Sequence, residues 1–196
     1  VMNDNGTMVQ VAVTDLSAYF DDEITAMPNL VTVGAANTLT TLAGIPFYQG
    51  GTGSIYTHDV SGTDDSALSN TAYGITAMDA ITTGDDNVAI GTAALGANTS
   101  GGANTAVGRE ALRDNTTASN NVAVGQGSLA SNTTGTRNIA IGHGAYDSSD
   151  TESDNLAIGH DAMSTNTAGG VYNIAIGNYA LDVLTSGDGN VGVGME

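Results

Sequence analysis

The chain has no cysteine and no tryptophan, and only three of its 196 residues are lysine or arginine. The lack of cysteine excludes disulfides, thiolate metal sites and thiol nucleophiles. Three cations cannot neutralise the phosphates of a nucleic acid, and a net charge of −18 repels both nucleic acid and anionic lipid headgroups. No apolar run approaches the roughly 20 residues needed to cross a bilayer. We therefore expect no nucleic-acid binding and no membrane insertion.

The chain is rich in glycine and poor in charged residues. The chain has 27 glycines, roughly twice the usual share, while 12% of its residues are charged, about half the usual share. A hydrophobic content of 40% is too high for a disordered chain. Aromatic residues are concentrated before residue 74, so the composition changes there. We therefore predict a linker or attachment segment over residues 1–69 and a repeat domain over residues 70–196.

The second segment repeats the word Asn-x-Ala-[Ile/Val]-Gly in eight copies, the first and last of them degenerate. Six of the intervals are 17 residues and one is 18. The words begin at Asn70, Asn87, Asn104, Asn121, Asn138, Asn155, Asn173 and Asn190. They end at Gly74, Gly91, Gly108, Gly125, Gly142, Gly159, Gly177 and Gly194. We place the extra residue of the longer interval near Gly169-Gly170, where a turn can absorb it.

Each word is followed by a small residue and a larger apolar one, as in Ala94-Leu95, and then by a threonine-rich turn, as in Thr133-Thr134-Gly135. One unit therefore predicts a strand, a short strand and a turn. A 17-residue period rich in glycine and β-branched residues favours a β-solenoid, whose coils stack about 4.8 Å apart. Equivalent asparagines would then ladder their amides or occupy turns with positive φ, and glycines would mark sharp corners or close backbone contacts.

Two other solenoids fit the sequence poorly. A hexapeptide β-helix needs an aliphatic residue every six positions, but Arg113 and Asp147 stand six residues after the aliphatic residue of their words. The Gly-Gly-x-Gly-x-Asp units of calcium-binding rolls are missing.

The word also predicts assembly. Its second and fourth positions are mostly apolar and share one face of the strand, while alanine points to the other face. With the second apolar word added, these columns exceed what one thin coil buries. A homotrimer around the rod axis would cover the surplus, since cyclic symmetry closes such a contact.

The unit, continued by Asn-Thr-Thr-Gly as at Asn132-Thr133-Thr134-Gly135, resembles the repeats of phage tail-fibre proteins and related bacterial surface fibres. In shorter form it is similar to the head repeat of trimeric autotransporter adhesins of the YadA type. The resemblance covers residues 70–194. It implies an all-β fold, a trimeric left-handed β-roll of about eight coils, that serves as a shaft or adhesive head. The unit departs from the pattern at Tyr73, Gly192 and Asp150-Thr151-Glu152, where we expect altered local geometry.

The first segment predicts a small mixed structure. Met8 to Val13 alternate as in a strand. Asp15 to Met27 predict one short helix that Pro28 ends, and its apolar face holds Leu16, Tyr19, Phe20, Ile24 and Met27. The segments Asn29 to Gly34 and Gln49 to Gly53 look like short β-rich fibre linkers.

Few residues suggest chemistry. His143 and His160 occupy equivalent positions one coil apart and should stack about 5 Å from each other, which makes them candidate metal ligands. Their column also holds Thr92, Arg109 and Gln126, which favours a solvent face over a metal site.

Acidic side chains could bind Ca²⁺ between chains, or they could form a solvated rim that prevents aggregation. They are Asp21-Asp22, Asp64-Asp65, Asp85-Asp86, Asp150, Glu152 and Asp154. Glu110 and Asp114 could serve as a catalytic pair, but ion pairs with Arg109 and Arg113 explain them more simply. His58 is isolated, so we expect no catalytic residue, no cofactor and no enzymatic activity.

These observations favour a structural fibre segment, on a virion tail fibre or another extracellular surface, that spaces or presents a receptor-binding tip. Expected partners are two sister copies, other virion tail or fibre proteins, and a host surface glycan or protein receptor. A bacterial surface adhesin head is the alternative. A third is an ice-binding solenoid using the threonine column Thr82, Thr99, Thr116 and Thr133. An open solenoid end exposes strand edges, so we expect a cap, a further domain or a cleaved chaperone after Glu196.

Overall fold

The computed structural model describes residues 41–42, 45–46, 55–57, 66–165 and 170–195. The chain divides into two compact units, Val1–Phe47 and Tyr48–Glu196. In the first unit, β1 (Thr41–Leu42) and β2 (Ile45–Pro46) form an antiparallel pair. The strand, helix and linkers expected before residue 54 lie outside the described residues.

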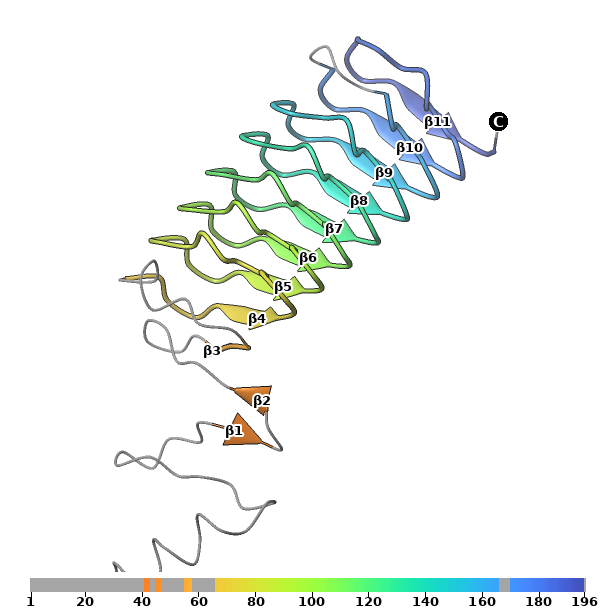
Figure 1. The fold of residues 1–196 in the computed structure, drawn as a ribbon. Helices are drawn as coiled ribbons and strands as arrows, with labels where there is room; N and C mark the ends of the chain where they lie inside the picture. The colour runs from red at the N-terminus through yellow and green to blue at the C-terminus, as the bar shows by residue number, and fades with distance from the viewer. Residues whose placement is uncertain (1–40, 43–44, 47–54, 58–65, 166–169, 196) are drawn as a thin grey trace, which may run out of the picture. The chain divides into compact units, whose positions relative to one another are not determined.

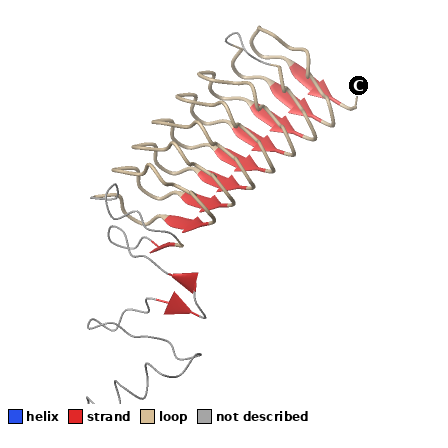
Figure 2. Cartoon of the chain, viewed as in Figure 1, coloured by secondary structure: helices blue, strands red, loops and turns tan. Residues whose placement is uncertain are grey.

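The second unit is a stack of parallel strands (Figures 1 and 2). The strands are β3 (Ile55–Tyr56), β4 (Thr71–Tyr73), β5 (Val88–Ile90), β6 (Thr105–Val107), β7 (Val122–Val124), β8 (Ile139–Ile141), β9 (Leu156–Ile158), β10 (Ile174–Ile176) and β11 (Val191–Val193). They form one sheet in chain order. The described residues contain no helix, and therefore none that could span a membrane.

The register of this sheet confirms the 17-residue solenoid. Ala89 pairs with Ala106, and Ala106 with Ala123, so each word lies directly beside the next. The eight words of β4–β11 are separated by seven full turns of the chain. The sheet also includes β3, whose Tyr56 pairs with Ala72. A parallel sheet wound in this way buries one face inside each coil and leaves the other outside.

The second apolar word does not form the short strand that we predicted. Ala94-Leu95 and its equivalents lie in turns, and the larger residue has a left-handed backbone, with φ of 50° at Leu95, Leu112 and Leu129. A strand over this word would continue in one direction, whereas a left-handed residue turns the chain. The turn aims the large side chain into the coil. The unit is therefore one strand joined by successive corners.

The core of the solenoid is a set of columns inside the coil. The alanine of each word is buried in β4–β10, and so are the small and large residues of the second word, such as Ala111 and Leu112. Tyr56 fills the alanine position at the β3 end. Contrary to our expectation, a single chain buries the second word from Ala77-Met78 to Ala162-Met163, and only Leu181 of the last pair is partly exposed. Exposed apolar side chains recur on the outer face of the strands, as at Ile139 and Ile141, and also stand in turns, as at Ile75 and Val183.

The longer interval is absorbed where a turn was expected. The backbone N–H of Tyr146 donates to the carbonyl of Ala162, 16 residues later. The equivalent hydrogen bond from Met163 reaches the carbonyl of Ala180, 17 residues later. The amide of Val171 bonds to the Asp188 carboxylate, at the standard spacing of 17 residues. The extra residue therefore lies between Met163 and Val171.

Candidate functional site

The asparagine that opens each word ties one coil to the next. Its Oδ1 accepts a hydrogen bond from the backbone N–H of the equivalent asparagine, at 2.8–3.0 Å in all seven steps from Asn70 to Asn190. Its Nδ2 donates across its own coil, as from Asn121 to the Gly135 carbonyl at 2.9 Å. Aspartate could not do both, because a carboxylate has no donor. The predicted ladder is thus confirmed, and each asparagine also closes its own turn.

Both the backbone conformation and the contact with the next coil require glycine at the end of each word. Gly125 has φ of 133°, a conformation that side chains disfavour. A Cβ atom at this position would also lie 2.5 Å from the carbonyl carbon of Gly142 in the next coil. The predicted close backbone approach is therefore present.

A second asparagine ladder runs along the turns. Nδ2 of Asn115 donates to Oδ1 of Asn98 at 3.0 Å, and Nδ2 of Asn132 to Oδ1 of Asn115 at 3.2 Å. The next coil has Ser149 at this position, so the ladder stops. Within the described residues, Oδ1 of Asn132 consequently has no hydrogen-bond partner.

Glu152 replaces the missing asparagine. It is buried, and its Oε2 accepts hydrogen bonds from the Ser149 hydroxyl at 3.0 Å and from the N–H groups of Asp150 and Thr151 at 3.2 and 3.3 Å. Burial acts to raise the pKa of this carboxyl, but these hydrogen bonds outweigh it, and the pKa is lowered overall. The altered local geometry that we expected at residues 150–152 is thus a change in the side chain that closes the turn: the Glu152 carboxylate takes the place of an asparagine amide.

The outer face of the sheet presents an apolar stripe, which we define as the second and fourth word positions of β5–β11. These are Val88, Ile90, Thr105, Val107, Val122, Val124, Ile139, Ile141, Leu156, Ile158, Ile174, Ile176, Val191 and Val193. Ile139 and Ile141 are each 39% exposed, because equivalent side chains of neighbouring coils cover the rest. The stripe contains no charged residue, although the chain carries a net charge of −18. Contiguous exposed apolar surface of this kind usually marks an interface.

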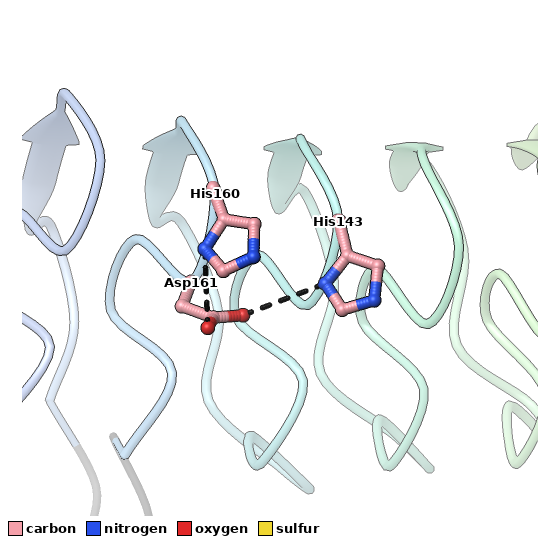
Figure 3. A group of neighbouring side chains, drawn as sticks. All are labelled: His143, His160 and Asp161. Carbon is pink, nitrogen blue, oxygen red and sulfur yellow. Dashed lines mark ion pairs between the residues drawn. The ribbon is translucent and has the colours of Figure 1, made fainter.

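Two histidines and an aspartate meet on another part of the surface (Figure 3). The rings of His143 and His160 stack with centroids 5.1 Å apart and planes 9° from parallel, as the coil spacing predicted. Both Nδ1 atoms face the carboxylate of Asp161. The distances are 3.7 Å from His143 to Oδ1 and 3.2 Å from His160 to Oδ2. Sequence reasoning found the histidines but not Asp161.

The other acidic residues mostly have partners. Glu110 lies 2.8 Å from Arg109, and Asp114 lies 2.6 Å from Arg113, so the ion pairs that we expected are present. Asp154 is paired with Arg137 at 2.6 Å, which lowers the pKa of Asp154.

The calcium site expected between chains stays a prediction, because a single chain does not test it. The Asp85 carboxylate accepts a hydrogen bond from the Leu68 backbone. Asp21-Asp22 and Asp64-Asp65, like His58, lie outside the described residues.

The threonine column is used within the solenoid. The hydroxyls of Thr82, Thr99 and Thr116 donate to the carbonyl of the equivalent residue one coil on, at 2.8–3.1 Å. Thr133 donates in the same way to Asp150. These hydroxyls therefore join coils.

Compared with known proteins, the chain matches no protein-family model, no curated protein and no solved structure.

Proposed function

We propose that the chain is a non-enzymatic structural segment of a fibre, in a phage tail fibre, where it spaces or presents a receptor-binding tip. The observation that supports this most strongly is the strict repetition of the coil. The same asparagine bonds and the same glycine contacts recur from one coil to the next. A solenoid built from one repeated contact grows in one direction and resists bending at each step, which suits a shaft.

The apolar stripe supports assembly into a homotrimer. Each chain carries a large negative charge, so sister copies repel one another over most of their surface. The stripe is the part of the described sheet where they can approach without bringing like charges together. Three stripes facing a common axis would bury the apolar surplus of every coil and leave the acidic residues outside.

The virion assignment is tested by locating the protein on native particles. Antibodies raised against the whole chain should label the fibres of a purified virion, with preimmune serum as the control. Label on the bacterial surface in the absence of phage would contradict the assignment and favour an adhesin head. The threonine hydroxyls bond between coils, which gives no support to an ice-binding face.

A further inference from the structure

Asp161 reaches both histidines because of a glycine in the neighbouring coil. Asp161 follows His160 in the chain, and Gly144 follows His143 at the equivalent position. A Cβ atom at Gly144 would overlap Oδ1 of Asp161. Other coils hold Ala93, Glu110 or Tyr179 here, so glycine is not required by the fold itself. The space left at Gly144 is what allows one carboxylate to face imidazoles from two coils.

One ligand atom of the cluster is shielded from solvent. The His160 side chain is 43% exposed, but its Nδ1 atom is buried and, within the described residues, contacts Oδ2 of Asp161 at 3.2 Å without forming a hydrogen bond. The Tyr179 ring packs against the His160 ring in an edge-type arrangement, with centroids 5.2 Å apart, which limits rotation of the imidazole. A buried polar atom without a hydrogen bond is costly unless another ligand satisfies it.

We propose that His143, His160 and Asp161 form a binding site for a divalent transition-metal ion, with Zn²⁺ as the reference ion. One nitrogen from each histidine and one carboxylate oxygen lie within 4.8 Å of one another. Two imidazoles and one carboxylate suit Zn²⁺, Ni²⁺ or Cu²⁺, whereas Ca²⁺ and Mg²⁺ prefer oxygen ligands alone. Three protein ligands leave a position open for water or for a donor group of another molecule.

The proposal is tested by calorimetric titration of the full chain with Zn²⁺. The ligand variants His143→Gln and His160→Asn introduce residues that their column already holds at Gln126 and Asn178, so the coil is expected to fold. Each should weaken the tightest Zn²⁺ binding by at least about tenfold. Asp161→Asn should do the same. Asp150→Asn removes an exposed charge elsewhere and should leave binding unchanged.

A second pair of variants leaves all three ligands in place. Gly144→Ala should weaken Zn²⁺ binding, because the methyl group displaces Asp161. Gly127→Ala is the matched control: it lies one coil earlier in the same column and its Cβ would meet nothing within 4 Å. Equal Zn²⁺ binding by all variants would mean diffuse attraction to an acidic surface and would overturn the proposal. Displacement of Zn²⁺ by equimolar Ca²⁺ would overturn it as well.

A spectroscopic readout keeps the test independent of binding heats. On addition of Co²⁺, the imidazole proton resonances of His143 and His160 should broaden at substoichiometric metal, before those of His58. Equal broadening of all three histidines would contradict the site.

Discussion

At the scale of single residues, the fold depends on side chains that bond in two directions. Asn121 accepts from the next coil and donates to Gly135 within its own. Replacing it by aspartate keeps the shape but removes the donor and buries a charge. We expect Asn121→Asp to reduce the free energy of unfolding by about 3 kcal/mol. The neighbouring Asn120 is exposed, and Asn120→Asp should change it by less than about 0.5 kcal/mol.

Urea denaturation of both variants measures this difference. If both substitutions reduce the free energy of unfolding by the same small amount, the asparagine ladder does not stabilise the solenoid.

Gly125 makes a second prediction at this scale. In Gly125→Ala the new methyl group meets the backbone of the next coil and takes up a disfavoured φ, so we expect a loss of more than about 2 kcal/mol. Gly127→Ala also has positive φ, at 68°, but meets open space. It should cost about 1 kcal/mol or less. Thermal unfolding followed by circular dichroism compares the two, and equal losses would show that coil contact at Gly125 is not the cause.

At the scale of the structural element, the turn at residues 149–152 exchanges one closure for another. Ser149 and Glu152 stand where three other coils have asparagine followed three residues later by glycine or alanine. Because the two substitutions depend on each other, we expect strong coupling. Ser149→Asn or Glu152→Gly alone should destabilise the chain by about 1–2 kcal/mol. The double variant restores the regular turn and gives Asn132 a partner, so it should recover that loss. Additive losses in urea unfolding would contradict the exchange.

The same turn predicts a dependence on pH. The folded pKa of Glu152 is lowered, so its carboxylate contributes stability above the ordinary glutamate range. That contribution is lost as the pH falls through the folded pKa. The stability difference between the wild type and Glu152→Gln should therefore be largest near pH 7 and shrink on acidification. Urea unfolding midpoints of both proteins across this pH range measure the stability difference. A difference that does not change with pH would show that the charge of Glu152 does not stabilise the turn.

Because the sequence repeats, the coil length and the positions of the strands could be predicted. The spacing of Asn87, Asn104 and Asn121 fixed the coil length, and the Ala-x-Gly words located the strands. The corners were not predictable, because Leu95 normally favours helices or strands, and only the closed coil forces it to φ of 50°. Asp161 was also missed. Its role depends on Gly144 one coil away, a contact that no local pattern indicates.

At the scale of the whole molecule, the apolar stripe should decide the state of assembly. Ile139 and Ile141 lie at its middle and point away from the core. Replacing both by lysine should leave the coil folded but place charge in the apolar contact that we propose between copies. We expect a monomer with an unchanged circular dichroism spectrum. Thr117→Lys with Thr134→Lys, at exposed turn positions off the stripe, is the control and should leave the assembly intact.

The central claim is that sister chains cover this stripe around a shared axis. Sedimentation equilibrium of the full chain measures its mass in solution directly. The account predicts a single species of three times the chain mass that the Ile139 and Ile141 double variant converts to one chain. A stable, folded, soluble monomer of the unmodified chain would contradict it.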